Sequence, residues 1–436
     1  MPSSESSNSP SQPTADRFYR PWAVWMLRVV IGAVFCVSGF VKGVDPWGSV
    51  IKIGEYLDAW GWDVPDGMVT AAAFALAGYE FVWGSLLLLG CYKRVSVWAL
   101  SLMMAFMLPL TLYIAIASPV DDCGCFGDAI ILSNNATFVK NVLITAGLLY
   151  LWLYNRRSGG LFLPYVQWIA GGLVTLYILV IELIGYNIQP LVDFRRFAPG
   201  TALVTANGDT DDDDPDIVME YTYEKDGEQH KFPIDNLPDS TWTFVSAEVV
   251  EGEVNDSDGF VILDDGEDIT TDVIDSGTEQ FIVTIPDFRN VDLSSTYIIN
   301  ELNDYITSRG GSLIALVGGG DRGLEWWQDI SMATYPIYRA DPKMIKELAR
   351  GNAAIVYLDH GRVEWKRTIG SISFTLITDE EARGNLLEIL DPQSGYTLKL
   401  VSVVFGGVML VVFILDRSGW LLTWHLKRRK KKDLQA

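Results

Sequence analysis

Six long apolar stretches constrain the fold of this chain more than any other feature. A helix of about 20 residues crosses the hydrocarbon core of a bilayer, which is roughly 30 Å thick. The six stretches lie near residues 22–41, 69–90, 96–117, 138–154, 162–184 and 398–415. Each is expected to be helical, because hydrocarbon offers no partner to an unpaired backbone group. The sequence therefore predicts a polytopic α-helical membrane protein in contact with membrane lipid.

Charged residues are distributed unevenly along the chain, which has 436 residues with 55 acidic and 33 basic side chains. Residues 186–397 hold 41 of the acids but only 15 of the bases, whereas the remainder holds 14 acids and 18 bases. A polar region this acidic repels phosphate, so the composition excludes a nucleic-acid-binding protein. Four cysteines in a chain of this length also exclude a small disulfide-stapled domain.

The positions of the basic residues predict the orientation in the membrane. All basic clusters flanking the spans fall on one side if the six stretches cross: Arg17 and Arg20, 93–94, 156–157 and 427–432. Both termini are then cytoplasmic. The loops 42–68 and 118–137 and the acidic region 186–397 lie on the external, periplasmic face of a cell inner membrane.

The region outside the membrane has a mixed α/β pattern. Residues 217–280 alternate polar and apolar positions around the turn pairs Asp226-Gly227 and Asp265-Gly266, which is typical of short strands. Further strands are then expected at 281–285, 312–317, 334–338, 353–358 and 363–368, and helices at 295–309, 322–332, 342–350 and 379–390. Asp341 is expected to cap the helix that begins at Pro342.

This order of strands and helices resembles the thioredoxin-like fold. A working thioredoxin site would place a cysteine pair near Gly318–Gly323 and a proline just before the strand 353–358. The chain has Asn352-Ala353-Ala354 at the second place and no cysteine after Cys125. The resemblance therefore implies a domain that cannot exchange thiols and that binds or docks an envelope protein partner.

The candidate chemistry lies in Cys123-Gly124-Cys125, within the loop between the third and fourth stretches. A close thiol pair in an oxidising compartment is expected to be redox-active or bridged. A disulfide across one residue is strained and easily reduced, and Gly124 gives the backbone the freedom that the small ring needs. Asp121 and Asp122 oppose thiolate formation unless a cation offsets them. The alternative for the pair is a structural cross-link.

Cys36 and Glu80 are the other candidate site residues. Cys36 lies roughly 9 Å below the outer end of the first span and could face the Cys123/Cys125 pair; its alternative is a small hydrophobic residue. Glu80 lies in the middle of the second span, where it is protonated, paired inside the bundle, or part of a polar lining for a quinone. Cys91 lies at the opposite end of the second span and is expected to be apolar filling.

Other titratable residues give no further site. The three histidines, His230, His360 and His425, are scattered, so no metal site is predicted. Lys140 and Asn141 lie near the outer start of the fourth span. They pair with groups such as Glu80, or they reach the lipid headgroups.

Several of these residues carry a family resemblance. The first span resembles the first-helix pattern of the DoxX-like membrane family through Arg28, Gly32, Phe35, Gly39, Lys42, Asp45 and Pro46. Glu80, Gly84 and the Leu-Leu-Leu-Leu-Gly run match its second helix. The run from Cys123 to Asp128, followed by Lys140-Asn141, is similar to the methylamine-utilisation MauE branch, over about residues 20–155.

The rest of the chain resembles a Bacteroidetes-type extension of that family, with a fifth span and a cysteine-free thioredoxin-like domain. Residues 188–195 and 266–270 look like its signature stretches. MauE-like proteins are associated with the maturation of methylamine dehydrogenase, and their bundle is compared with quinone-linked, disulfide-forming membrane enzymes. The resemblance thus implies a quinone as cofactor, but no methylamine chemistry is readable in this chain.

The expected organisation has seven parts. They are a disordered tail (1–16), a four-helix membrane domain (17–157), a fifth span (158–185), a linker with a small β-rich segment (186–280), a thioredoxin-like domain (281–392), a sixth span (396–416) and a basic tail (417–436).

The sequence is compatible with two functions. One is a membrane thiol–disulfide oxidoreductase that uses Cys123 and Cys125, with Cys36 as a relay. The other is a non-enzymatic envelope scaffold.

Overall fold

The computed structural model describes two compact parts of the chain. The described residues are 20–117, 124–130, 132–155, 159–203, 218–225, 228–233, 243–251, 260–264 and 267–433. Contacts divide the chain into Met1–Val192 with Gln393–Ala436, called the membrane unit below, and Asp193–Pro392, called the α/β unit.

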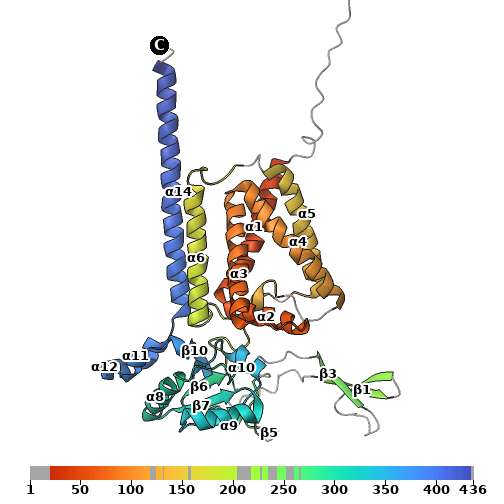
Figure 1. Ribbon diagram of the computed structural model, residues 1–436, viewed down its shortest axis with the longest axis vertical. Coiled ribbons are helices and arrows are strands. Elements are labelled where there is room, and N and C mark those ends of the chain that lie inside the picture. The colour runs from red at the N-terminus through yellow and green to blue at the C-terminus, as the bar shows by residue number, and fades with distance from the viewer. Residues whose placement is uncertain are drawn as a thin grey trace, which may run out of the picture. The chain divides into compact units, whose positions relative to one another are not determined.

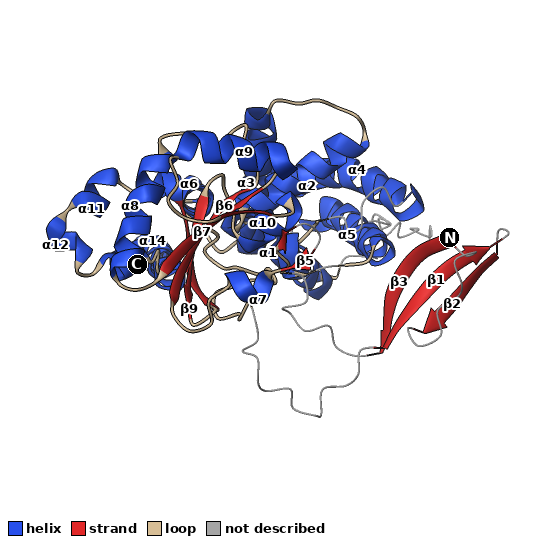
Figure 2. Cartoon of the chain, turned by 90° about the horizontal axis from the view of Figure 1, so that it is seen from below, coloured by secondary structure: helices blue, strands red, loops and turns tan. Residues whose placement is uncertain are grey.

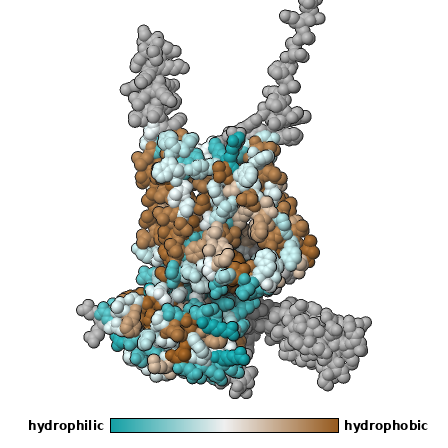
Figure 3. Space-filling view, viewed as in Figure 1, coloured by the Kyte–Doolittle hydropathy of each residue, from teal (hydrophilic) through white to brown (hydrophobic). Residues whose placement is uncertain are grey.

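The membrane unit is built from long helices. They are α1 (Pro21–Val44), α2 (Pro46–Ala59), α3 (Asp66–Leu89), α4 (Lys93–Ala117), α5 (Asn134–Tyr154), α6 (Gln167–Asn187) and α14 (Ser394–Asp433). All of these except α2 are long and apolar enough to cross a membrane, α14 through its first part, Ser394–Gly419. The surface of this unit is largely hydrophobic (Figure 3). The six expected spans are therefore confirmed as helices, and the chain is a multi-pass membrane protein with six candidate spans.

The last two spans pack side by side (Figure 1). The hydroxyls of Tyr177 on α6 and Ser402 on α14 lie 2.9 Å apart. The aromatic rings of Tyr177 and Phe405 stack with centroids 4.4 Å apart. Near the C-terminal end of the spanning part of α14, Asp416 accepts a hydrogen bond of 3.2 Å from the backbone N–H of Leu163. The C-terminal span thus belongs to the same unit as the first five.

One expectation for the membrane unit was wrong: residues 42–68 are not simply a loop, because they contain the helix α2. Asp45 caps this helix by accepting a hydrogen bond of 3.0 Å from the N–H of Gly48, and Pro46 occupies the first helical position. An Asp-Pro pair is a recognised start signal for a helix. The sequence contains this start signal at Asp45-Pro46, but in the sequence analysis the short amphipathic segment that follows is treated as part of the connection between two spans.

The α/β unit is organised around a mixed five-stranded sheet (Figure 2). Its strands, in the order β10-β9-β6-β7-β8, are β10 (Arg362–Thr368), β9 (Ala354–Asp359), β6 (Glu279–Ile285), β7 (Ser312–Val317) and β8 (Ile337–Arg339). Strands β6, β7 and β8 run parallel, whereas β9 is antiparallel to both β6 and β10. The main helices are α8 (Ser295–Ser308), α9 (Gly320–Ser331) and α10 (Pro342–Leu348), the last capped by Asp341 as expected.

Alternating side chains of the strands build a hydrophobic core on each face of this sheet. Phe281, Val283 and Ile285 of β6 face the helix α8 and residue Trp327 of α9. Ile282 faces α10 and the segments around residues 197–203 and 260–274. Because both faces are covered, the strands read as nearly continuous apolar runs, which is why the sequence located them well.

Two smaller expectations need correction. The single helix expected at 379–390 is divided into α12 (Glu380–Arg383) and α13 (Leu386–Leu390), preceded by α11 (Phe374–Thr378). Gly384-Asn385 interrupts it, since glycine is a poor helix former. Residues 217–280 do form strands: β1 (Val218–Lys225), β2 (Glu228–Pro233) and β3 (Thr243–Glu251) make an antiparallel sheet, and β4 (Leu263–Asp264) pairs with β5 (Glu267–Asp268). However, α7 (Thr270–Val273) is helical.

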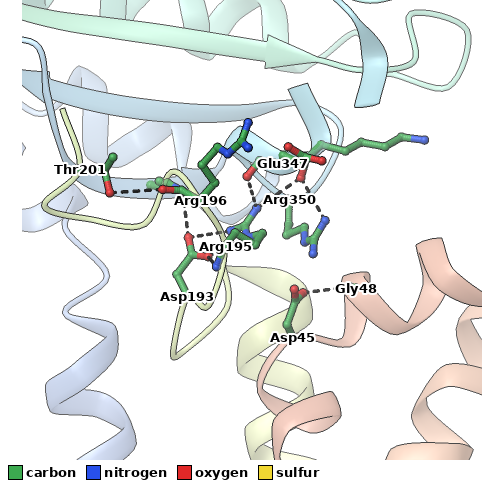
Figure 4. A network of polar contacts seen from close by, with 10 residues as sticks. Asp45, Gly48, Asp193, Arg195, Arg196, Thr201, Glu347 and Arg350 are labelled. Atoms are coloured by element: carbon green, nitrogen blue, oxygen red, sulfur yellow. Dashed lines mark hydrogen bonds and ion pairs between the residues drawn. The ribbon is translucent and has the colours of Figure 1, made fainter. Parts of the chain in front are cut away.

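A buried ion network holds the start of the α/β unit in place (Figure 4). Arg195 donates to both carboxylate oxygens of Asp193 at 2.7 and 2.8 Å, and Lys366 of β10 donates to the same carboxylate at 2.8 Å. Arg195 also donates to the carbonyl of Glu347 at the end of α10. Burial alone would raise the pKa of Asp193, but Arg195 and Lys366 outweigh it and lower that pKa to about 2.

We expect this network to determine the acid stability of the α/β unit. Asp193 stays ionised in the folded protein down to about pH 2, below its ordinary pKa of 3.8, so its contribution is complete above pH 3.8 and is lost as the pH falls between these values. Asp193→Asn should remove this dependence. At pH 7 it should cost about 3–5 kcal/mol of unfolding free energy, because Arg195 stays buried without a counter-charge, and Lys366, whose pKa burial lowers to about 7, loses the carboxylate that favours its charged form.

The measurement is thermal unfolding of the purified full-length protein as a function of pH. Glu279→Gln is the matched control, since it breaks the more exposed Glu279–Arg309 pair, whose atoms lie 2.9 Å apart. The control should cost less than about 1 kcal/mol. Equal effects of the two substitutions would contradict the assignment.

Candidate functional site

The helices α1 and α3 approach each other closely through glycines. A Cβ atom on Gly39 would lie 2.3 Å from the backbone N of Phe81, and one on Gly84 would lie 2.6 Å from the backbone N of Cys36. Neither distance is possible for a larger residue without a shift of the backbone. The two helices can therefore present short polar contacts to each other in the middle of the bundle.

A buried ion pair uses this close approach. Lys42 on α1 and Glu80 on α3 meet with Nζ and Oε2 2.7 Å apart, and their side chains are only 5% and 3% exposed. Glu80 is thus paired inside the bundle, one of the alternatives considered for it. Lys42 also donates to Ser38 Oγ at 2.9 Å, one turn before it on α1. Such a pair is costly to desolvate, and its stability depends on further hydrogen bonds.

Those further hydrogen bonds reach the backbone of Cys125. Lys42 Nζ donates to the carbonyl oxygen of Cys125 at 2.7 Å. The Ser38 hydroxyl lies 2.6 Å from that oxygen and 2.6 Å from Glu80 Oε2, and it has one proton to donate to either. All three protons of the Lys42 ammonium are therefore engaged. The backbone of Cys125 is therefore fixed to the α1/α3 contact near the end of α1.

Residues 124–127, called the cysteine segment below, have a defined backbone. Gly124 and Gly127 both adopt left-handed conformations, with φ of 62° and 53°, which glycine tolerates best. The N–H of Gly127 donates to the carbonyl of Gly124 at 3.1 Å and closes a tight turn. A Cβ on Gly124 would lie 2.7 Å from Cγ of Lys52 on α2. The helix α2 thus lies directly against the cysteine segment.

A cavity opens beside this network. The space is small and holds little more than one water molecule. Its walls come from α1, α3, α4, α5 and the cysteine segment. The lining residues are Val34, Phe35, Ser38, Glu80, Met103, Met104, Met107, Cys125, Phe126, Lys140, Asn141 and Ile144. The cavity is therefore mainly apolar, with Ser38, Glu80, Lys140 and Asn141 as its polar side chains.

Lys140 and Asn141 from α5 take different roles at this cavity. The Lys140 ammonium lies 4.5 Å from the centroid of the Phe126 ring, which is a cation–π contact. Asn141 is buried and donates to Thr111 Oγ1 of α4 at 3.2 Å. Asn141 thus joins α5 to α4, whereas Lys140 adds a second cation near the cysteine segment.

The predicted cysteines do not all gather at this site. Cys36 lies in a cluster with Phe81, Tyr177 and Ile178, and its Sγ lies 3.4 Å from Ser85 Oγ. It does not line the cavity that Cys125 lines. Cys91 is fully buried in another cluster, with Phe162 and Ala170 among its neighbours. Cys123 lies outside the described residues.

The spaced residues of α1 each have a structural task. Arg28 donates to the carbonyls of Leu87 and Leu88 at the end of α3, where a cation is favoured. Gly39 permits the close approach to α3, and Lys42 binds Glu80. Sequence reasoning missed the role of Ser38 and the Lys42–Glu80 contact. The available signal was a lysine and a serine four residues apart on one face of a membrane helix.

Comparison with known families places this site within a recognised domain. Residues 20–154 match the family described as "Methylamine utilisation protein MauE", and residues 217–250 match a domain of unknown function, DUF8463. No curated protein and no solved structure matches the chain. Residues 20–154 comprise α1 to α5, including Lys42, Glu80 and Cys125, so the chain carries a MauE-family domain that contains the whole site. The expected MauE resemblance is confirmed.

Breaking the central ion pair should destabilise the membrane unit. Lys42→Met leaves Glu80 buried without its counter-charge and should cost about 3–5 kcal/mol, whereas the double variant Lys42→Met/Glu80→Met should recover most of this loss. Thermal unfolding in detergent measures the effect. The matched control is Lys52→Met, which breaks the partly exposed Lys52–Glu55 pair and should cost less than about 1 kcal/mol. A double variant no more stable than Lys42→Met would argue against a charge-pairing role.

Proposed function

We propose that this membrane protein exchanges disulfides with proteins of the cell envelope through Cys123 and Cys125. The observation that carries the proposal is the position of Cys125. Its backbone carbonyl is held by Lys42 and Ser38 at a cavity within the helical bundle. A cysteine segment that served only as a connection between α4 and α5 would not need this buried anchor.

The chemistry of the pair fits reversible exchange. A thiolate of an external protein attacks one sulfur of the Cys123–Cys125 disulfide, so that this bond breaks and a mixed disulfide forms. The second thiolate of the same protein then attacks the mixed disulfide and leaves as part of a new disulfide. Two electrons have passed from the external protein to the pair, which becomes a dithiol. A disulfide that closes so small a ring is readily reduced in this way.

The charge of the site supports this role. Lys42 and Lys140 place two cations beside the cysteine segment, and Glu80 neutralises one of them. Positive charge favours the thiolate form, which is the attacking species. We propose that Lys140 supplies the cation that offsets Asp121 and Asp122, two acidic residues that precede the pair and lie outside the described residues.

A quinone is the acceptor that we propose for the electrons of the dithiol. A bound quinone would take up the two electrons and two protons that the dithiol releases when the Cys123–Cys125 bond re-forms. The lining is mainly apolar, with Lys140 and Asn141 among its polar side chains, and a ring would enter only after these walls move apart, because the space between them holds little more than one water molecule. Cys36 is left out of this route, because it lies in a separate cluster with Ser85 as its polar neighbour.

The proposal also covers the orientation of the chain in the membrane and the role of the α/β unit. The distribution of basic residues favours the cysteine segment and the α/β unit on the periplasmic side of the inner membrane. We propose a thioredoxin-like fold for the α/β unit, supported by its parallel β6/β7 pair and antiparallel β9/β10 hairpin. It has no cysteine between β7 and α9, so its work would be to hold the partner protein rather than to exchange thiols.

Trapping of a mixed disulfide tests the exchange. In cells that express Cys125→Ser, the Cys123 thiolate can attack the disulfide of an oxidised partner, and the mixed disulfide then lacks the Cys125 thiol that would release the partner, so it should accumulate on non-reducing gels. The double variant Cys123→Ser/Cys125→Ser should lose this adduct. Cys36→Ser, added to Cys125→Ser, is the control and should leave the adduct unchanged. An adduct that persists in the double variant would count against the proposal.

Thiol labelling at graded redox potentials separates exchange from a scaffold role. The purified protein should titrate reversibly between about −320 and −120 mV, the range of cellular thiol systems that includes those of oxidising compartments. Variants that lack Cys36 or Cys91 should give the same midpoint. A pair that stays bridged or stays reduced over the whole range would indicate a structural loop and a non-enzymatic envelope scaffold.

A further inference from the structure

A second carboxyl is buried in the membrane unit, and it has an environment unlike that of Glu80. Glu182 lies in the last third of α6, within a candidate span, and is 0% exposed. Neither of its carboxyl oxygens has a hydrogen-bond partner among the described residues. Glu80, by contrast, receives Lys42. One unit therefore contains a carboxyl neutralised by a lysine and a carboxyl with no such partner.

Glu182 occupies the junction of three helices. A Cβ on Gly78 of α3 would lie 3.6 Å from Glu182 Oε1, and a Cβ on Gly43 of α1 would lie 3.5 Å from Glu182 Cγ. Its neighbours on α6, Ile178 and Ile181, are fully buried in the apolar cluster at this junction. The Glu182 carboxyl is thus enclosed by α1, α3 and α6, where Gly43 and Gly78 leave room for the glutamate side chain.

The titratable and charged groups around this junction are engaged elsewhere. On α1, Lys42 uses its three protons on Ser38, Glu80 and the carbonyl of Cys125. Asp45 at the end of α1 accepts from the N–H of Gly48. The remaining groups have polar neighbours of their own: Cys36 has Ser85, and Tyr177, on α6 itself, has Ser402. Among the described residues, no cation forms an ion pair with Glu182, because neither of its carboxyl oxygens has a hydrogen-bond partner.

We propose that Glu182 is a proton-binding site of the membrane unit. An unpaired carboxylate in an apolar, water-free junction is strongly disfavoured, whereas the protonated acid is neutral. The packing of α6 against α1 and α3 therefore requires the bound proton, and loss of the proton favours separation of α6. The inference stands on the burial and contacts of Glu182, and it does not depend on the proposed thiol chemistry.

The first test is the pH dependence of thermal unfolding for the full-length protein in detergent. If the folded state holds a proton that the unfolded chain releases, the unfolding equilibrium constant should rise by up to about tenfold per pH unit above the ordinary range of a glutamic acid. Glu182→Gln should remove this component, whereas Glu55→Gln, at a partly exposed carboxyl of α2, should keep it. Identical pH profiles for wild type and Glu182→Gln would overturn the proposal.

The second test keeps the proposal falsifiable if Glu182→Gln does not fold. Dicyclohexylcarbodiimide modifies protonated carboxyls in apolar surroundings. In liposomes at neutral pH, peptide mass spectrometry should find the adduct on Glu182 and none on the ion-paired Glu80, with less adduct as the pH rises. Modification of Glu80 but not Glu182 would overturn the proposal. Protection of Glu182 by NaCl but not by choline chloride would also overturn it, in favour of a cation site.

Discussion

The buried contact between Lys42 and Glu80 is the interaction on which the site of the membrane unit depends. Removing both charges from water is costly, and the cost is offset only because the lysine engages three oxygens at 2.7 to 2.9 Å. The three acceptors come from α1, α3 and the cysteine segment. The same ammonium therefore fixes the relative position of two helices and the path of the backbone at Cys125.

In both units, a few buried polar groups fix the contact between elements that are distant in the sequence. In the membrane unit, the glycines of α1 and α3 bring the backbones together so that a short serine and a lysine can reach one carboxylate. In the α/β unit, Asp193 joins Arg195 and Lys366 in the same way and ties the entering chain to β10. In each case, a buried carboxylate with two donors specifies a junction that apolar packing alone would leave less well defined.

The sequence predicted those parts of the structure that follow from local periodicity. The six apolar stretches and the strands of the central sheet were located well, because burial on all sides gives a continuous apolar signal. The helix α2 was missed because its signal, Asp45-Pro46, was read as part of a connection. The division of 379–390 at Gly384-Asn385 was also missed, although glycine gave a local signal there.

The site could be predicted only in part, because it depends on contacts between distant residues. Glu80 was singled out as a costly charge within a span, and Lys42 was noted at the end of the preceding span. Their pairing needed the glycine contacts of α1 and α3, which no local pattern reveals. For the same reason, the sequence could not place Cys36 away from Cys125, since both orientations of α1 are compatible with its apolar composition.

The most direct measurement of the central claim is the rate at which Cys125 reacts with a membrane-impermeant maleimide applied to intact cells. The other three cysteines are replaced by serine, and the rate is compared with and without Lys42→Met/Glu80→Met. Hydrogen bonds from a charged donor contribute about 1.5–3 kcal/mol. Cys125 should therefore react from outside, slowly in the background variant and about tenfold to a hundredfold faster once the ammonium is removed. Equal rates, or labelling only after the cells are opened, would contradict the account.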